Sequence, residues 1–491
     1  MSKEEQQAEL IRHQADRISE LEAVVAKLMA LVEKQASQIE KQGIEIAALK
    51  EQLGRSSRNS SKPPSSDGPA EPPRAKKRSK GRKRGGQVGH KAHKRELEPS
   101  QKAETIVVCL PDRCGRCDTP LGGRDLEPLR HQVFDLPKVV AGFVEYQLHA
   151  RVCNCGCVTR AQLPPGVPRG AFGPGVVAAA ALLMGVYRLS KRMVPELMRD
   201  LFGLNMSVGA VVGCQKLASE AIAAPVEEAR THAIEQPIKH ADETGWHEGA
   251  SRARAWLWAL VTPLVAVFMI HARRNTDAAT ALLGRAAGVL VTDRHGAYGW
   301  WPDKRRQFCW SHLKRDVVAI LERGGESEEI GKSLLEEIDR MFYWWHRVRD
   351  GTLKRQSFEV YMRSLQIRFE AMLEVGKACS HPKTSKTCSK LHSHRASLWT
   401  FVRVKGVEPT NNVAEQTVRH AVLLRKVSYG THSQAGSRFI ERILTVHATL
   451  RRQRRNILAF LQEACAAKLY DRPAPSLLPV AASRVELAQA A

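Results

Sequence analysis

Three carboxylates lie in sequence contexts that suit metal chemistry. Asp242 lies in "PIKHADETGWHE" at the end of a short strand-like segment, and Asp293 follows the apolar run "VLVT". Glu415 lies in "VEPTNNVAEQTVRHAV", where Thr410 or Asn411 can cap a helix. Clustered carboxylates raise one another's pKa values unless a cation is bound, and hard oxygen ligands of this kind suit Mg²⁺ or Mn²⁺. The three acids are therefore candidate catalytic metal ligands.

Each acid also has a plainer explanation. Asp242 can cap a turn, Asp293 can open the turn "DRHG", and Glu415 can pair with Arg419 one helical turn later. Glu243 is an adjacent rival to Asp242, but alternation along a strand puts the two on opposite faces, so only one should serve. Taken together on a basic protein, the three acids favour the metal site.

The segments around these acids predict a mixed sheet. "PIKHADETGWHE", "RAWLWALVTP" and "LVAVFMIHAR" indicate three strands in an antiparallel meander, followed by a helix that Thr276 or Asp277 caps. "VLVT" is a fourth strand, and "QFCWSHLKRDVVAILER" begins extended and turns helical. If the first and fourth strands are neighbours, Asp242 and Asp293 lie side by side. Two metal ions about 4 Å apart would then activate water or a 3′-hydroxyl for in-line phosphoryl transfer.

The composition favours a polyanionic partner. The 491 residues allow two to four domains and are 43% hydrophobic, enough for a sizeable core. Lys and Arg exceed Asp and Glu by 76 to 51, a net charge of +25, which indicates nucleic acid. The charged start "MSKEEQQAEL" is no secretory signal, and the longest apolar run, Val176–Tyr187, is too short for a bilayer. We expect a bacterial cytoplasmic, nucleoid-associated protein with no membrane partner and a buried helix at that run.

The first hundred residues indicate a coiled coil and a basic linker. One seam repeats every seven residues through Ile11, Ile18, Val25, Val32, Ile39, Ile46 and Leu53. β-Branched residues there, with Leu21, Leu28 and Leu49 on the second seam, favour a parallel two-stranded homo-oligomer. A Ser/Pro-rich stretch follows, and eleven basic residues without an acid lie between Arg74 and Arg95. Such a segment is expected to be disordered without a polyanion and can grip DNA.

The cysteines favour structural zinc. Eleven cysteines without a secretory signal argue for metal or free thiols rather than disulfides. Cys114 and Cys117 form one CxxC pair, and Cys153, Cys155 and Cys157 crowd a second site. We take Cys153 and Cys155 as ligands, with Cys157 as the substitute, in a tetrahedral Zn²⁺ site; reduced thiols in a small β domain are the alternative. The intervening stretch 139–152, "VVAGFVEYQLHARV", is strand-like.

Residues 166–235 have a helical pattern. "MVPELMRDLFGLNMSVGAVVGCQKLASEAI" predicts helix, short turn and helix, with Gly203 and Asn205 in the turn and Ser207 as the second N-cap. This is compatible with a helix-turn-helix that reads a DNA groove, although ordinary helix pairs look alike.

Four motifs together resemble a known family. "HADETGW", "VTDRHGAY", "FCWSHLKRD" and "PTNNVAEQTVR" are similar to successive motifs of insertion sequence 66 family transposases, across nearly the whole chain. The resemblance implies an RNase H-like DDE domain with Asp242, Asp293 and Glu415 as the triad and Mg²⁺ as cofactor. Cys309, His312 and Arg315 become candidates for substrate contacts or support. Gln416 replaces an expected arginine, and the second cysteine group is irregular.

The expected fold class is multidomain α+β. The expected segments are coiled coil 8–54, disordered basic linker 55–100, zinc finger 101–165, helical region 166–235, RNase H-like catalytic domain 236–455 with a helical insertion at about 322–400, and C-terminal tail 456–491. The candidate DNA contacts are Lys76, Lys77, Arg78, Lys80, Arg82, Lys83, Arg84, Arg315 and Arg419.

The resemblance implies a transposase that cleaves element ends and joins a 3′-hydroxyl to target double-stranded DNA. Two alternatives stay open. One is a catalytically inactive DNA-binding regulator derived from a transposase, and the other is an RNase H-like nuclease or resolvase.

Overall fold

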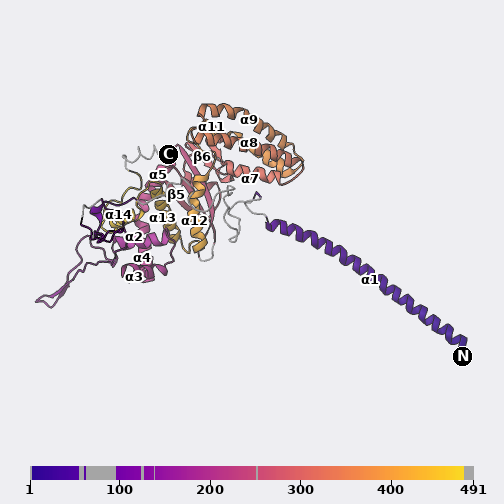
Figure 1. The fold of residues 1–491 in the computed structure, drawn as a ribbon, viewed down its shortest axis with the longest axis horizontal. Coiled ribbons are helices and arrows are strands. Elements are labelled where there is room, and N and C mark those ends of the chain that lie inside the picture. The colour runs from indigo at the N-terminus through magenta and orange to yellow at the C-terminus, as the bar shows by residue number, and fades with distance from the viewer. Residues whose placement is uncertain are drawn as a thin grey trace. The chain divides into compact units, whose positions relative to one another are not determined.

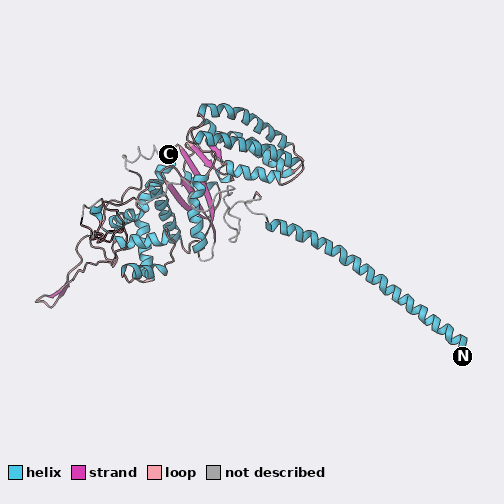
Figure 2. Ribbon diagram, in the orientation of Figure 1, coloured by secondary structure: helices cyan, strands magenta, loops and turns pink. Residues whose placement is uncertain are grey.

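The computed structural model describes residues 3–54, 60–61, 96–122, 127–137, 139–249 and 253–479. It divides the chain into two compact units. The first comprises Met1–Glu71, Gln147–Val194 and Ser207–Ala491, and the second comprises Pro72–Tyr146 and Pro195–Met206. Figures 1 and 2 show the mixed α and β content of the first unit, as the sequence predicts.

The N-terminal segment is a single helix, α1 (Lys3–Gly54). Apolar seam residues are exposed along it, for example Ile18, Leu28 and Ile39, which are 57%, 55% and 68% exposed. The helix confirms the predicted helical conformation. The apolar side chains of the heptad seam that the structure describes are exposed to solvent.

The cysteine-containing region has little regular structure. It contains the 3₁₀ turn η2 (Ser100–Lys102) and a short hairpin of β1 (Ala150–Val152) and β2 (Val158–Arg160). The strand expected over 139–152 is wrong except for β1, because no described strand pairs with the rest of it. In the second unit, the Ala141 N–H donates to the Phe202 carbonyl at the end of α3 (Met193–Phe202).

A group of helices packs beside the sheet in the first unit (Figure 1). Its members are α2 (Pro174–Gly185), α4 (Val208–Ala221), α5 (Ala223–Glu235), α13 (Gln434–Arg452) and α14 (Ile457–Leu469). Helix α2 is buried as predicted, and Ser207 caps α4 through a bond from the Ala210 N–H. None of the described helices has both the length and the apolar character needed to cross a bilayer.

Helix α14 corrects the expectation of a C-terminal tail from residue 456. Asn456 caps it, and Phe460, Leu461, Ala464 and Cys465 recur at helical spacing. These four side chains are buried, and α14 packs against α2 and α4. The described chain therefore stays part of the core well beyond the expected boundary.

The sheet has the order β5-β4-β3-β6-β7. Its strands are β3 (Ile238–Glu248), β4 (Ala253–Val261), β5 (Ala266–His271), β6 (Val289–Thr292) and β7 (Arg306–Phe308). Strands β3, β4 and β5 form the predicted antiparallel meander, and β6 and β7 continue parallel to β3. The first and fourth strands are thus neighbours, which was the condition for bringing two of the acids together.

Short elements connect the strands. They are α6 (Thr276–Leu283), η3 (Gly296–Tyr298) and η4 (Asp303–Arg305). The cap of α6 is Asn275, whose side chain accepts from the Ala278 N–H, and not Thr276 or Asp277. Asparagine at this position satisfies the first-turn donor that those residues were expected to bond.

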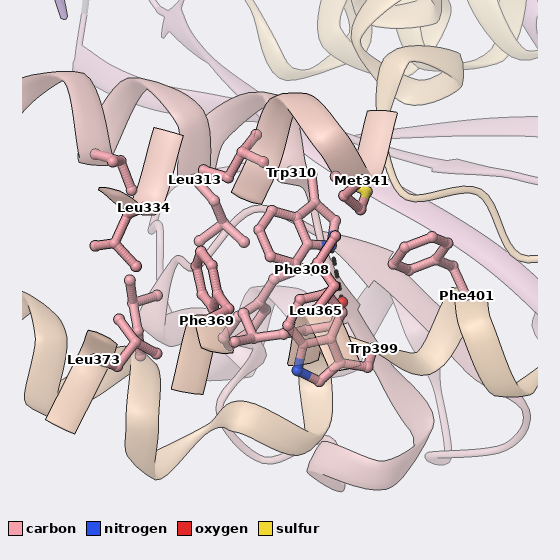
Figure 3. Close-up of a cluster of buried hydrophobic side chains, with 14 of the residues drawn as sticks. Phe308, Trp310, Leu313, Leu334, Met341, Leu365, Phe369, Leu373, Trp399 and Phe401 are labelled. Carbon is pink, nitrogen blue, oxygen red and sulfur yellow. Dashed lines mark hydrogen bonds between the residues drawn. The ribbon is translucent and has the colours of Figure 1, made fainter. Parts of the chain in front are cut away.

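Helices occupy most of the chain between the second and third acids, including residues 322–400, which were expected to be helical, and the last of them carries the third acid. The elements are α7 (Trp310–Leu321), α8 (Glu326–Arg349), α9 (Arg355–Lys377), α10 (Pro382–Ser393), η5 (Arg395–Ser397), α11 (Thr400–Arg403) and α12 (Asn412–Ser428). Buried side chains of the elements from α7 to α11 form one core around Trp310, Phe369 and Trp399 (Figure 3). The same core includes Phe308 of β7, so these helices are packed directly onto the sheet.

Side chains form hydrogen bonds to backbone groups of both edge strands, β5 and β7. On β5, Thr449 and Thr445 of α13 accept from the N–H groups of Ala266 and Phe268 at 3.1 and 3.0 Å. On β7, Thr400 donates to the Arg306 carbonyl at 2.6 Å. Spacing of four residues along α13 matches spacing of two along β5, so one helix face pairs with alternate residues of the strand.

Glu441 extends the α13 ladder by accepting from the Ile270 N–H. Burial raises the pKa of this carboxyl from 4.5 to about 7. Because the folded pKa is raised, its stabilisation is fully present below about pH 4.5 and is lost as pH rises through about 7.

We therefore expect Glu441→Gln to remove a pH-dependent stability term of roughly 2–3 kcal/mol. Between pH 5 and 8, the melting temperature should fall more steeply with rising pH in the wild type than in the variant. Parallel profiles would show that Glu441 titrates in the folded protein as it does in the unfolded chain.

Candidate active site

Two of the three acids lie at matching positions beside one another on neighbouring strands. Asp293 follows the end of β6 as expected, whereas Asp242 lies inside β3, which continues to Glu248, so the expectation that Asp242 ends a short strand was wrong. His240 of β3 pairs with Val291 of β6 in parallel register, and Asp242 and Asp293 each follow two residues later. Burial raises the pKa of Asp242 well above its usual value, and Glu243, Asp293 and Glu415 add repulsion. The charges of the other two predicted acids, Asp293 and Glu415, therefore both affect the pKa of Asp242.

Asn411 joins the third acid's helix to the sheet. It occupies the N-cap position of α12, but its side chain makes no cap bond, contrary to the expectation for Thr410 or Asn411. Instead, its Nδ2 donates to the Ala241 carbonyl at 2.8 Å, and its Oδ1 lies 3.1 Å from the His240 Nδ1. The amide is fully buried and fixes the start of α12 beside β3. The predicted cap is thus replaced by a tertiary contact.

Glu415 lies beside a thiol and an imidazole. Its Oε1 is 3.3 Å from the His312 Nδ1 and 3.8 Å from the Cys309 Sγ. Among the described residues, these three form the one group of possible metal ligands whose atoms lie within 4.8 Å of one another. The His312 Nδ1 has no hydrogen-bond partner despite its proximity, so the contact with Glu415 is electrostatic.

Cys309 and His312 are both held in uncharged forms. Burial raises the pKa of the Cys309 thiol to about 11. Burial lowers the pKa of His312, and the Arg315 cation lowers it further, against the opposing charge of Glu415. A buried neutral thiol is a poor metal ligand. Cys309 has another contact, because its Sγ accepts from the Asn411 N–H at 3.1 Å.

Glu243, the rival of Asp242, is engaged elsewhere. Arg274 contacts its Oε1 through Nε at 2.8 Å, and the Tyr298 hydroxyl donates to Oε2. Burial raises the pKa of Glu243, with Asp293 adding to this, while Tyr298 and Arg274 oppose it. Both oxygens are therefore committed to protein groups. This supports Asp242 as the member of the pair that is available to a metal.

The turn after β6 is held by main-chain contacts. Asp293 Oδ1 accepts from the His295 N–H at 2.9 Å, which is the turn-opening role also expected of it. Arg306 of β7 donates to the Asp293 carbonyl at 2.9 Å and to the Thr292 hydroxyl at 3.2 Å. Burial lowers the pKa of Arg306 to about 10, so the side chain remains a cation. The backbone that carries Asp293 is therefore fixed from the neighbouring strand.

A cavity of about 500 Å³ opens at Asp293. Basic side chains line much of it, namely Arg294, His295, His312, Arg315 and Lys390. Arg294 is paired with Asp316, whereas Arg315 and Lys390 form no ion pair with any described residue. Free cations next to a carboxylate suit a substrate that carries phosphate.

The other residues predicted to bind DNA or zinc lie in several parts of the chain. Arg419 is exposed and makes no ion pair with Glu415 or any other residue described. The basic linker residues Lys76 to Arg84 lie outside the described residues. Cys114 and Cys117 lie in the second unit and Cys153, Cys155 and Cys157 in the first, each unit being described by itself.

The sequence did not point to several residues that build this site. They are Arg274, Tyr298, Arg306 and Lys390. Asn411 was expected only as a helix cap and instead bonds to the Ala241 carbonyl. Tyr298 and Asn411 did lie within quoted motifs, "VTDRHGAY" and "PTNNVAEQTVR", and that position was the available signal. The other three lie in segments without a distinctive pattern.

Comparison with known protein families shows which family the chain belongs to. The model of the "Transposase IS66 family" matches residues 169–438, more than half of the chain. The chain belongs to the IS66 transposase family. A second family, "Family of unknown function (DUF6444)", matches residues 9–96, which contain most of α1 and the basic linker. No match was found among curated proteins.

Membership gives the geometry a context. The IS66 match spans all three acids as well as Cys309, His312 and the cavity residues. It begins just before α2 and ends at Arg438 in α13, so it includes α2, α4 and α5 and the first residues of α13, but not α14. An IS66 family transposase suggests a DNA-acting enzyme, which agrees with the basic composition.

Proposed function

We propose that the protein is a DDE transposase that cuts DNA at insertion-sequence ends and transfers the freed 3′-hydroxyl into target DNA. The observation that carries this is the matching register of Asp242 in β3 and Asp293 just after the neighbouring parallel strand β6, with Glu415 acting on the Asp242 carboxylate. We take the sheet as an RNase H-like core. The antiparallel meander continued by parallel strands supports that assignment.

Asp242, Asp293 and Glu415 would hold two Mg²⁺ or Mn²⁺ ions. Carboxylate oxygens fit hard divalent cations, and the repulsion that Asp293 and Glu415 exert on Asp242 is the kind that a bound cation relieves. The ions would supply Lewis-acid stabilisation of the attacking and leaving oxygens. Glu415 also lies close to His312 and Cys309, which keep its carboxylate beside the strand ends.

The chain's own residues would position the DNA. In cleavage, a water oxygen forms a bond to phosphorus and the 3′-oxygen leaves with a proton. In transfer, that 3′-hydroxyl forms a bond to a target phosphorus and a target 3′-oxygen leaves. Arg315 and Lys390 line the cavity and would bind phosphate oxygens. Arg306 and Asn411 would keep the two acid-bearing segments in place without contacting DNA.

Metal-dependent nicking of DNA that carries an element end tests the function. Nicking and joined products with Mg²⁺, and neither with EDTA, are expected. Binding without any nicking would favour the inactive regulator. Nicking without joined products would favour the nuclease.

We also propose a structural Zn²⁺ bound by Cys114, Cys117, Cys153 and Cys155, with Cys157 as the substitute. Hydrogen bonds from Thr119 and Cys114 lower the pKa of Cys117 to about 7, and contacts with Cys155 lower that of Cys153. Thiolates are the form that binds zinc, so both shifts support the assignment.

We further propose that α1 forms a parallel coiled coil with a second copy. Its exposed seam supports this, because an isolated amphipathic helix would leave that apolar surface in water. The basic linker that follows would hold DNA non-specifically.

Deletion of residues 1–53 should therefore lower the mass measured by light scattering. Val32→Glu, on the seam, should have the same effect because it buries a charge in the interface. Lys34→Glu, off the seam, should not. An unchanged mass after the deletion would contradict the coiled coil.

A further inference from the structure

Arg188 occupies a backbone conformation that normally belongs to glycine. It follows α2 with a φ of 66°, in the left-handed region. The Tyr187 and Leu189 N–H groups fold back to the Leu182 and Leu183 carbonyls at 3.1 and 3.0 Å. Helices that end in this way usually place glycine at the left-handed position, because a side chain there is strained. An arginine that remains at a strained position is a candidate for function.

Arg188 lies close to a pair of stacked histidines. The rings of His420 in α12 and His447 in α13 have centroids 4.5 Å apart. Arg188 and Arg451 are the arginines whose charges act on both rings, and no acid contributes. The Val186 backbone also acts on the pKa of His420, which places the end of α2 near α12. Three helices therefore bring four basic groups together.

The cluster has no local neutralising charge. Neither Arg188 nor Arg451 has a hydrogen bond or ion pair from its side chain to any described residue. The sequence contains no Asp or Glu from Tyr146 to Pro195, nor between Glu441 and Glu463. Unpaired cations that also repel one another cost stability unless an anion approaches.

The cluster is connected to the candidate active site. His420 lies on α12, the helix that carries Glu415. Arg452, next to Arg451, bonds to Thr417 of the same helix. An anion bound at the cluster would therefore lie on the structure that positions the third acid.

We propose that Arg188 and Arg451 form a phosphate-binding site. This site would bind the DNA backbone at a place separate from the proposed metal-binding acids. The choice of DNA as the anion rests on the proposed function. The neutral His420 and His447 rings form part of the same cluster. Bound phosphate offsets the repulsion between the two arginines, which explains why arginine is kept at a position that favours glycine.

Arg188→Gly gives a sharp test, because glycine suits the left-handed backbone while removing the cation. The melting temperature should equal or exceed that of the wild type. Duplex binding measured by fluorescence anisotropy in Ca²⁺ should weaken, and the slope of log K against log salt should fall by about 1. Arg451→Gln should lower the slope similarly, and the double variant by about 2.

Arg363→Gln is the matched control. Arg363 is an exposed arginine of α9 without an ion pair to any described residue, so its loss changes net charge equally. Its salt slope should match that of the wild type. An unchanged slope in both cluster variants, or an equal fall in the control, would overturn the phosphate site.

Histidine NMR gives a second readout. Burial, His420, Arg451 and Arg188 lower the pKa of His447 to about 4. Arg188→Gly should raise this pKa in the free protein, and DNA should raise it in the wild type. An unchanged His447 pKa on DNA binding would also overturn the proposal. Wild-type nicking is scored separately, so its absence alongside a lowered slope in Arg188→Gly would reject the proposed catalysis and retain the phosphate site.

Discussion

Replacing Asp293 with asparagine is expected to abolish nicking and strand transfer, a loss of about 10³-fold or more. The side chain would keep its shape and its bond to the His295 N–H but would lose the charge that is proposed to hold a divalent cation. Arg306 holds the main chain of this residue, so the fold should be unaffected. End-labelled DNA resolved on a denaturing gel measures both products.

Binding separates this effect from unfolding. The variant should bind duplex DNA in Ca²⁺ at least as tightly as the wild type, because a charge that repels phosphate is gone. Asp277→Asn removes an exposed carboxylate from the first turn of α6 and should retain full activity. Full activity of Asp293→Asn with Mg²⁺ present would refute the mechanism.

Trp310→Ala should produce the largest loss of stability, about 3–5 kcal/mol. The side chain is fully buried, and its rings lie 4.8 Å from Trp399 and 5.3 Å from Phe369. Its Nε1 donates to the Leu398 carbonyl at 2.9 Å, so truncation leaves both a cavity and an unpaired carbonyl (Figure 3). Denaturant unfolding followed by tryptophan fluorescence and circular dichroism measures the change.

The same substitution should also impair catalysis. Trp310 begins α7, which carries His312, and its backbone N–H bonds to the Pro409 carbonyl before α12. A collapsed cavity would shift both helices that flank Glu415. Tyr343→Ala is the matched control, because Tyr343 is an aromatic of α8 that is 56% exposed. It should cost less than about 1 kcal/mol and leave nicking unchanged. Equal losses in the two variants would contradict the role given to this core.

The position of Asp293 after a strand could be predicted because its signal is local, whereas β3 continues past Asp242. "VLVT" is buried and apolar, and the carboxylate after it ends the strand in both the prediction and the structure. The antiparallel meander followed from three adjacent apolar segments. Glu415 was harder, because its approach depends on how far-separated helices pack. Carboxylate chemistry on a basic protein suggested that it joins the other acids, and the family resemblance strengthened that assignment.

What the sequence missed depends on tertiary contacts. Asn411 reads as a helix cap, but burial beside β3 offers it a carbonyl and an imidazole instead. Residues 456–469 were expected to be a tail, because a short helix is stable only when its apolar residues pack against other elements. Here those elements are α2 and α4, which the sequence does not identify. Residues 139–149 were expected to form a strand from composition alone, but a strand needs a partner.

The two closed edges of the sheet affect how copies of this protein can meet. Edge strands with open N–H and C=O groups can add a strand from a neighbour, which leads to aggregation. Here Thr445 and Thr449 occupy one edge, and Thr400 contributes at the other. The catalytic core thus offers little template for strand-to-strand growth. If copies of this protein assemble, we therefore expect them to meet through other surfaces and not through strand pairing at the sheet.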